Sequence, residues 1–421
     1  MNFIAIINLT IAALFFVCYA YQFIYIGVPI LKKPEAHKTI RQNRFAVLIA
    51  ARNEASVIRY LIDSIHAQTY DSSRITVFVI ADNCTDDTAR IAQRAGAIVY
   101  KRTNPHLIGK GYALNELLRF IHRDYPDRLF DGYFVFDADN VLDPHYVAEM
   151  NRTFSDGYEI ITSYRNSKNY GDNWISAGYG LWFLRESKYL NNARMLLHTS
   201  CAIGGTGFLV SRSVLERTGG WNFFLLTEDI EFTIDRIVNG EKIAYCNKAI
   251  LFDEQPTQFR QSWNQRMRWA KGFLQVFRKY GRALVRQTVK GSFSAYDMVM
   301  TTMPAMLLSI FGILLNITSV IIGWTTGHTE WIQTGTIALL QTVISVYLTA
   351  FLLALITTIT EWKQIHTTTL RKIAYMFTFP LFMMTYIPIA LCAIFRKVRW
   401  TPIVHERAQS LTEICSRNHA A

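Results

Sequence analysis

The sequence predicts an α/β domain with a mostly parallel sheet, joined to α-helices that span a membrane. Short apolar segments alternate with segments of helical spacing between residues 45 and 137, and long charge-free runs lie near both ends of the chain. Of the 421 residues, 51% are hydrophobic and 18% are charged, whereas soluble domains have about 25% charged residues. This composition excludes a disordered chain, a collagen-like repeat and a coiled coil.

The order of strand-like and helix-like segments supports the α/β prediction. Strands that alternate with helices form a mostly parallel, Rossmann-like sheet with helices on both faces, and such sheets bind ligands at the carboxyl ends of their strands. The predicted strands are Phe45–Ala50, Ile75–Ala81, Ala97–Tyr100 and Gly132–Asp137. The predicted helices are Glu54–Ala67, Asp86–Ala95 and Lys110–Phe120.

The charge-free runs predict transmembrane helices. Residues 1–31 carry no charge, and this run is longer than the roughly 20 residues that cross a bilayer. Because Lys32 and Lys33 follow directly, the N-terminus is expected outside and the next domain in the cytoplasm. Three more charge-free runs come late in the chain: Met298–Thr329, Trp331–Thr360 and Ile373–Phe395. We therefore expect one transmembrane helix within residues 1–33 and about three within 297–396.

The side of the membrane on which the tail, residues 397–421, lies is left open. An even number of spans would put this tail outside, whereas Arg396 and Lys397 favour the inside. A broken or re-entrant segment would remove the conflict, and Ile373–Phe395, which contains two prolines, is the candidate.

Polar residues follow the predicted strands. Asp137 and Asp139 stand at the end of the fourth strand, and two carboxylates at this spacing can share a hard cation such as Mg²⁺ or Mn²⁺. Such an ion would neutralise a diphosphate leaving group. The alternative is a plain turn, because aspartate is frequent at strand ends. Asn53, Glu54 and Asp82 follow the first two strands and are expected at the same edge of the sheet.

Thr227-Glu228-Asp229 opens another predicted helix. In the simplest interpretation Thr227 caps the helix and the two acids interact with its dipole. In a functional interpretation Asp229 is a general base, a role that contributes about 10²–10⁴-fold to a rate.

A basic segment follows, and it contains the sequence Gln265-Arg-Met-Arg268-Trp269. Residues 257–292 hold nine basic residues and no acid, which favours amphipathic helices on the inner membrane surface. This segment also explains the net charge of +12 without nucleic acid. Arg268 could pair with phosphate oxygens. Trp269 could offer a flat face to a sugar ring, or it could simply pack in the core.

Weaker signals are compatible with ordinary structural roles. Gly109-Lys110-Gly111 at a helix start could hold phosphate, but a lone lysine there is usually solvated. The glycines within 204–207 could let the backbone approach a ligand, or they could form a plain turn. His145 and His405 have no partner pattern, which favours core or surface roles. The six cysteines are scattered, so we expect free thiols, no disulfide framework and no zinc site.

Taken in order, four motifs resemble the D, DxD, [TE]D and QxxRW signature of membrane-embedded family 2 glycosyltransferases, which include cellulose, chitin-oligomer and hyaluronan synthases. The motifs are Asp82, Asp137-Ala-Asp139, Thr227-Glu-Asp229 and Gln265-Arg-Met-Arg268-Trp269. The resemblance covers roughly Phe45–Gly272 and the flanking spans, and the ordered set is far more specific than any single motif. It implies a GT-A fold over residues 42–256, an inverting transfer and a nucleotide-sugar donor, usually a UDP-sugar.

The resemblance also implies roles at the donor. Asp82 is expected to contact the uracil, with Asn53, Glu54 and Lys110 nearby. Asp139 and Asp137 are expected to hold Mg²⁺ or Mn²⁺ on the diphosphate, and Asp137 also to contact substrate. The chain departs from the usual pattern because Arg52-Asn-Glu54 replaces a YNE stretch and Asp82-Asn83 replaces a double acid.

At the acceptor, the resemblance implies that Asp229 deprotonates the attacking hydroxyl and that Glu228 binds substrate. Gln265, Arg268 and Trp269 are expected to cover the diphosphate and to support the acceptor.

We therefore expect a multi-pass protein of the cell membrane that extends a polysaccharide from a cytoplasmic UDP-sugar and exports it. Its partners would be the bilayer and a carbohydrate or lipid-linked acceptor, without nucleic acid, and an oligomer or an accessory export subunit is possible. The first alternative is a non-processive enzyme that adds one sugar to a lipid carrier. A transporter is disfavoured because the charged residues lie outside the apolar spans, and a decayed subunit because all four motifs are intact. A hydrolase with paired carboxylates has no use for a diphosphate site.

Overall fold

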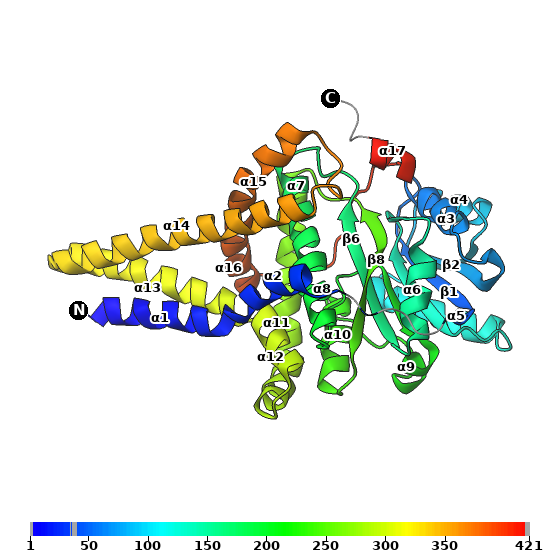
Figure 1. Ribbon diagram of the computed structural model, residues 1–421, viewed down its shortest axis with the longest axis horizontal. Coiled ribbons are helices and arrows are strands. Elements are labelled where there is room, and N and C mark those ends of the chain that lie inside the picture. Colours follow the sequence, from blue (N-terminus) through cyan, green and yellow to red (C-terminus); the bar gives the residue numbers. More distant parts are fainter. Residues whose placement is uncertain (1–2, 34, 36–39, 417–421) are drawn as a thin grey trace.

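The computed structural model describes residues 3–33, 35 and 40–416. Residues 1–2 and 417–421, which belong to the predicted first helix and tail, lie outside the described residues. Figure 1 shows an α/β domain built on one sheet, with a group of long helices extending from one side of it. In the described part of the chain the sheet has eight strands in the order β3-β2-β1-β4-β7-β6-β8-β5.

The first half of the sheet is parallel, as predicted. β1 (Phe45–Ala51) pairs in parallel with β2 (Ile75–Asp82) and β4 (Gly132–Asp137), and β2 pairs with β3 (Ile98–Arg102). The helices that connect these strands are α3 (Ile58–His66), α4 (Thr88–Arg94) and α5 (Lys110–Asp124). The α/β fold class, with its mostly parallel sheet, is therefore confirmed.

The strand β1 is apolar along its whole length because both of its faces are covered. Ala46 and Leu48 belong to the core that contains Leu114 of α5, whereas Val47 and Ile49 belong to a second core on the opposite face. Successive side chains of a strand point to opposite faces, so a strand covered by helices on both faces needs apolar residues at every position.

The second half of the sheet is mixed. β7 (Phe208–Ser211) is antiparallel to both β4 and β6 (Ile160–Ser167), β6 is parallel to β8 (Ile243–Asp253), and β5 (Val141–Leu142) closes the edge. β1, β2, β4, β6 and β8 consequently run in one direction. Their last residues share one edge of the sheet: Ala51, Asp82, Asp137, Ser167 and Asp253.

The remaining helices of the domain pack around this sheet. They are η1 (Ser72–Arg74), α6 (Tyr146–Ser155), α7 (Trp174–Arg185), the π-helical turn η2 (Glu186–Asn191), α8 (Asn192–Leu196), α9 (Arg212–Arg217) and α10 (Glu228–Val238). α11 (Phe259–Val289) and α12 (Phe293–Thr302) lie between the domain and the long helices (Figure 1). The prediction of several helices within 257–292 was wrong, because no proline interrupts this stretch and it forms the single helix α11.

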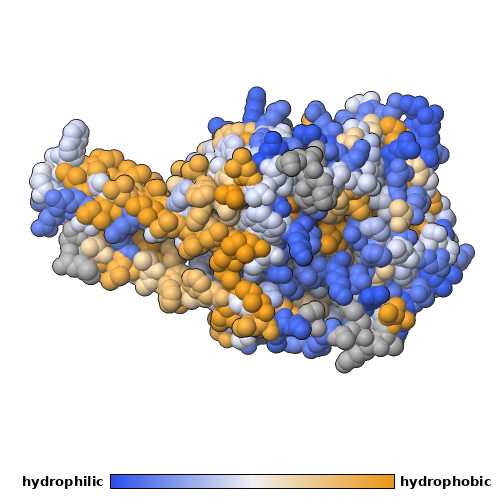
Figure 2. All heavy atoms as spheres, turned by 45° about the horizontal axis from the view of Figure 1, so that its top comes forward, coloured by the Kyte–Doolittle hydropathy of each residue, from blue (hydrophilic) through white to orange (hydrophobic). Residues whose placement is uncertain are grey.

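Four segments are long and apolar enough to cross a membrane by length and composition: Phe3–Leu31, Leu307–Thr326, Thr329–Thr360 and Thr369–Phe395. The first comprises α1 (Phe3–Tyr19) and α2 (Tyr21–Leu31), and the next two form α13 (Pro304–Thr326) and α14 (Thr329–Thr360). α1, α13 and α14 extend side by side, and Asn8 and Asn316 exchange amide hydrogen bonds of 2.8 Å between α1 and α13. Hydrophobic residues cover this extension, whereas hydrophilic residues cover much of the domain (Figure 2).

The fourth apolar segment forms two helices and not one. This arrangement affects the side of the membrane on which the tail is expected. Its two parts, α15 (Thr369–Met384) and α16 (Tyr386–Phe395), meet at Thr385. α15 packs against α7 and α14, and α16 packs against α11 and runs across the direction of α13 and α14 (Figure 1). The chain then returns to the domain, where Ile414 of α17 (Leu411–Ser416) packs with Val141 and Phe252. The tail and the domain therefore lie on the same side of the three extended helices.

A buried charge pair connects the N-terminal helices to the domain. Arg194 of α8 pairs with Asp297 of α12, with 2.7 Å between Nε and Oδ2, and both side chains are almost fully buried. Tyr21 and Tyr25 of α2 donate their hydroxyl groups to the same carboxylate at 2.7 and 2.8 Å. Asp297 thus joins three separate parts of the chain.

Replacing Asp297 by alanine is expected to lower the free energy of unfolding by about 3–5 kcal/mol, because Arg194 would remain buried without its counter-charge. Chemical denaturation of the detergent-purified protein measures this effect. Asp63→Ala is the matched control, since Asp63 is exposed and contacts Arg59 on the surface. Equal stability of the two variants would contradict the prediction.

Candidate active site

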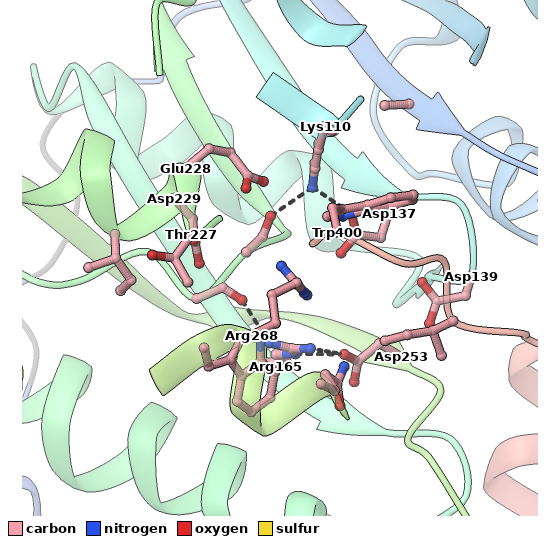
Figure 3. A pocket seen from close by; sticks show the side chains of 18 of the residues that line it. Lys110, Asp137, Asp139, Arg165, Thr227, Glu228, Asp229, Asp253, Arg268 and Trp400 are labelled. Carbon is pink, nitrogen blue, oxygen red and sulfur yellow. Dashed lines mark hydrogen bonds and ion pairs between the residues drawn. The ribbon is translucent and has the colours of Figure 1, made fainter. Parts of the chain in front are cut away.

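A cavity of about 280 Å³ opens at the edge of the sheet where the parallel strands end. Its wall is formed by the domain, by α11 and by the C-terminal segment that follows α16. The predicted site residues that line it are Glu54, Asp82, Lys110, Asp137, Asp139, Glu228, Asp229, Gln265, Arg268 and Trp269. Figure 3 shows Thr227, Glu228 and Asp229 on one side and Asp139 and Asp253 on the other.

Asn53 is the one predicted residue outside the cavity lining. It adopts a left-handed backbone conformation with a φ of 58° after β1. Its side-chain oxygen accepts a hydrogen bond of 2.8 Å from the Thr85 N–H, so it joins the two loops that follow β1 and β2. In this structure Asn53 shapes the loop that carries Glu54.

Lys110 and Asp137 form an ion pair inside the cavity. Asp137 ends β4, and Lys110 begins α5 after Gly109, whose φ of 140° favours glycine. The Lys110 Nζ lies 2.5 Å from the Asp137 Oδ1 and donates to the Gly205 carbonyl at 2.8 Å. The Lys110 ammonium group thus pairs with a carboxylate that was predicted to bind metal.

Asp139 is buried on the side of the cavity away from Asp229 (Figure 3), and its Oδ2 accepts a hydrogen bond of 2.8 Å from the Glu254 N–H. Burial acts to raise its pKa, but the positive charges of His405 and Lys168, together with this hydrogen bond, hold the pKa below its usual value. Asp139 is therefore ionised at neutral pH. Its carboxylate and that of Asp137 are oxygen donors of the type that Mg²⁺ and Mn²⁺ bind.

The metal prediction rests on these two carboxylates alone. Within residues 3–33, 35 and 40–416, no group of three or more His, Cys, Asp and Glu side chains could hold a metal ion. A divalent cation would need further oxygen ligands, since Mg²⁺ is bound through one or two carboxylates together with substrate phosphates and water.

Glu228 and Asp229 occupy the first turn of α10. Burial raises the pKa of both carboxyl groups, that of Glu228 to about 7 with a further contribution from the neighbouring Asp229. The side chain of Thr227 does not cap the helix; its Oγ1 is buried without a hydrogen-bond partner among the described residues. The simple capping interpretation is therefore wrong, and the two acids face the cavity.

Arg268 and Trp269 lie in α11 beside the cavity. Arg268 donates to the Leu226 carbonyl at 2.8 Å, so it holds the loop that leads to Glu228 and Asp229. Trp269 packs edge-on against Tyr179 and Phe183, with ring centroids 5.7 and 6.2 Å apart. Trp269 thus combines the predicted packing role with a position in the cavity lining.

Asp82 and Glu54 are each paired with a basic residue that sequence reasoning did not assign to the site. Asp82 lies 2.5 Å from Arg102, and both side chains are 7% exposed. Glu54 faces His405, whose Nδ1 is 3.0 Å from both carboxylate oxygens. Burial raises the pKa of Glu54 to about 7. Burial lowers that of His405, but Asp139, Glu54 and Glu254 together raise it to about 10.

His405, for which the sequence indicated no partner, thus lines the cavity because the C-terminal segment crosses it. Trp400 lies in the lining, with the Arg52 guanidinium 5.3 Å from its ring centre. The backbone N–H groups of Glu406 and Arg407 donate to the Glu254 carboxylate at 3.1 and 2.9 Å. This contact spans more than 150 positions of the sequence, and no spacing rule could indicate it.

Arg165 and Asp253 form another ion pair that sequence reasoning missed. Arg165 also donates to the Gly204 carbonyl at 2.7 Å. A signal for Asp253 was present, since Leu251-Phe-Asp253 repeats the pattern of Val135-Phe-Asp137, an apolar strand that ends in aspartate.

Comparison with known proteins gives matches over the domain that contains this cavity. Residues 42–272 match the family model described as "Glycosyltransferase like family 2". The chain is 29% identical over 253 residues to the probable glycosyltransferase YdaM of Bacillus subtilis, covering 56% of this chain and 57% of that protein. It is 26% identical over 255 residues to a beta-monoglucosyldiacylglycerol synthase of Synechocystis, with coverage of 59% and 52%.

A third similar protein is the poly-beta-1,6-N-acetyl-D-glucosamine synthase of Staphylococcus aureus, 23% identical over 235 residues with 53% of each chain covered. The chain thus spans about half the length of the curated relatives it matches. Among solved structures, the mannosyltransferase PcManGT of Pyrobaculum calidifontis, in complex with GDP-Man and Mn²⁺, has a TM-score of 0.54 at 16% identity. That likeness covers 92% of this chain and 99% of the other, and at this identity it shows the fold alone.

Proposed function

Because the chain belongs to glycosyltransferase-like family 2 and has its GT-A fold, we propose that it transfers a hexosyl group from a UDP-sugar to a hydroxyl group at the membrane surface. The observation that carries this proposal is that Lys110, Asp137, Asp139, Asp229 and Arg268 line one cavity. Cations placed where negative charge develops on a leaving diphosphate, with a carboxylate to take up a proton, are what such a transfer needs.

The donor would lie across the carboxyl ends of β1, β2 and β4, with its nucleoside near Asp82 and Glu54. Asp137 and Asp139 would hold Mg²⁺ or Mn²⁺, which supplies positive charge at the diphosphate. Lys110, which already contacts Asp137, and Arg268 would add further positive charge there.

At the acceptor, the Asp229 carboxylate would take the proton from the attacking hydroxyl group. The acceptor oxygen forms a bond to the anomeric carbon while the bond from that carbon to the UDP oxygen breaks, and the electron pair leaves with UDP. Attack from the side opposite the leaving group inverts the anomeric configuration. Burial of Asp229 strengthens its electrostatic interactions with the substrate.

The apolar helices support a proposal for the membrane position of the site. Lys32 and Lys33 follow the first apolar segment directly, and the positive-inside rule then puts the domain on the cytoplasmic side of the cell membrane. The tail packs on the same domain. We propose three crossing helices, α1–α2, α13 and α14, with α15 and α16 lying against the domain.

Two acceptors are compatible with this site. Extension and export of a polysaccharide, with an oligomer or an accessory subunit completing the path, follows from the family resemblance. A membrane lipid that receives one sugar is favoured by the apolar side chains of Trp182, Leu190 and Phe273 in the cavity lining, to which Thr301 also belongs. Thr301 lies in α12, the helix that precedes the membrane helix α13.

One experiment tests the function and separates the two acceptors. The full chain is reconstituted in liposomes with dioleoylglycerol and offered a panel of UDP- and GDP-sugars with Mn²⁺, with Mg²⁺ or with EDTA. We expect metal-dependent release of UDP and a labelled product. A ladder of product lengths indicates polymer extension, and a single addition to the lipid indicates the second acceptor. No turnover of any donor sugar would overturn the proposal.

The rate of transfer is expected to fall as the pH drops toward the raised pKa of Asp229. Asp229 accepts a proton only when it is ionised, so its raised pKa moves this loss above the usual aspartate value of about 3.9. The pH dependence of kcat/KM measures the effect. An acid limb at the usual aspartate value in the unaltered protein would contradict the prediction.

A further inference from the structure

Glu186 is a cavity residue that the proposed transfer does not yet use. It begins the π-helical turn η2, directly after Arg185 ends α7. π-Helical turns are rare and are frequently found at functional sites, since the extra residue re-aims the side chains that follow. Here the turn lies in the part of the chain that contributes Trp182, Glu186 and Leu190 to the cavity lining.

In the described part of the chain no hydrogen bond or ion pair holds the Glu186 carboxylate, although the charges of three arginines, Arg165, Arg194 and Arg185, act on it. All three arginines make contacts elsewhere, and Arg185 donates to the Gln22 side chain at 2.9 Å. Arg165 pairs with Asp253 and donates to the Gly204 carbonyl, and Arg194 pairs with Asp297. Glu186 is half-buried in the cavity wall, and a carboxylate partly removed from bulk water without a partner is costly. Burial also raises its pKa. A ligand that donates hydrogen bonds would remove this cost.

Glu186 and Asp229 approach the same two-residue loop. A Cβ added to Gly204 would lie 3.4 Å from the Glu186 Oε1, and one added to Gly205 would lie 3.6 Å from the Asp229 Oδ2. Consecutive residues of one loop therefore each approach one of the two carboxylates. The negative charge of Asp229 also acts on Glu186. A small hydroxylated group bound at this loop can reach both.

The surroundings of Glu186 differ from those of the donor end. Trp182 precedes it by one helical turn, which places the two on the same face of the helix. Leu190 and Phe273 continue the lining. An aromatic ring beside a carboxylate suits a sugar or polyol, because the ring covers the apolar face of the ligand and the carboxylate accepts hydrogen bonds from its hydroxyl groups.

We propose that Glu186 binds the acceptor by accepting hydrogen bonds from its hydroxyl groups and so orients the attacking hydroxyl toward Asp229. This inference rests on the proposed function and adds to it the chemistry of the acceptor: a head group with at least two hydroxyl groups, of which one reacts and another is held by Glu186. Such a head group occurs on a soluble oligosaccharide and on a glycolipid.

The test measures KM for donor and acceptor separately in Glu186→Ala, Glu186→Gln and the control Glu216→Gln, whose side chain is exposed and contacts Arg212. The donor is the UDP-sugar on which the full chain is active. The acceptors are a soluble tetrasaccharide of the same sugar in one arm and a monoglucosyl diacylglycerol in liposomes in the other. The arm with the shifted KM identifies the source of the head group.

We expect Glu186→Ala to raise the acceptor KM at least about tenfold, the effect of losing one charged hydrogen bond. Glu186→Gln, which keeps one acceptor oxygen, should raise it less. The KM for donor and the Mn²⁺-dependent binding of UDP, measured by calorimetry, should stay within twofold and show that the variants fold. An unchanged acceptor KM, or an equal loss of UDP binding, overturns this inference alone. Lack of transfer by the unaltered chain overturns the proposed function as well.

Discussion

Replacing Asp229 by asparagine is expected to lower the rate of sugar transfer by about 10²–10⁴-fold, the contribution of a positioned general base. Asparagine has nearly the same shape but cannot take up the proton of the acceptor hydroxyl. Asp229 lies in the first turn of α10, in a cavity that Lys110 and Arg268 also line. The loss should therefore appear in kcat, while UDP binding is retained.

The measurement is the initial rate of product formation at saturating donor, together with calorimetric titration of UDP in the presence of Mn²⁺. Asp235→Asn is the matched control, because Asp235 lies on the same helix but pairs with Arg236 outside the cavity. A variant Asp229→Asn that binds UDP normally and transfers sugar at the normal rate would show that another group removes the proton.

The parallel half of the domain could be predicted from the sequence because its signals are local. The run Phe45–Ala51 is apolar at every position, since both faces of β1 are covered. The polar residues that follow β1, β2 and β4 come to one edge, because parallel strands end together. Knowing the direction of the strands was therefore enough to bring Glu54, Asp82 and Asp137 into one cavity.

The remaining half of the site depends on contacts between distant parts of the chain. His405 reaches Glu54 only because α15 and α16 turn back against α7 and α11 and return the tail to the domain. Arg165 and Asp253 meet because β6 pairs in parallel with β8. Such pairings are decided by packing across the fold, and a histidine in a basic tail carries no local mark of its eventual partner. The ion pairs that hold the predicted carboxylates were accordingly missed.

The charges around Asp139 lead us to expect that its replacement lowers activity more than its position in a short motif indicates. His405 and Lys168 hold its pKa below the usual value, and the Glu254 N–H bonds to its Oδ2. The surrounding charges therefore keep a carboxylate ionised inside the protein, where an unbound carboxylate would tend to take up a proton. A group maintained in this way is suited to hold a divalent cation.

Replacing Asp139 by asparagine is accordingly expected to weaken Mn²⁺-dependent UDP binding and to lower the transfer rate by about 10²–10³-fold, the magnitude typical of removing one preorganised electrostatic contact at a developing charge. The amide keeps the shape of the side chain but carries no charge, so His405 and Lys168 would then repel the cation. Calorimetric titration of UDP with and without Mn²⁺ measures the effect. Asp63→Asn on the exposed face of α3 is the control. Undiminished Mn²⁺-dependent binding would mean that the cation is held elsewhere in the cavity, and Asp253 would be the next carboxylate to test, because it lines the same wall as Asp139 (Figure 3).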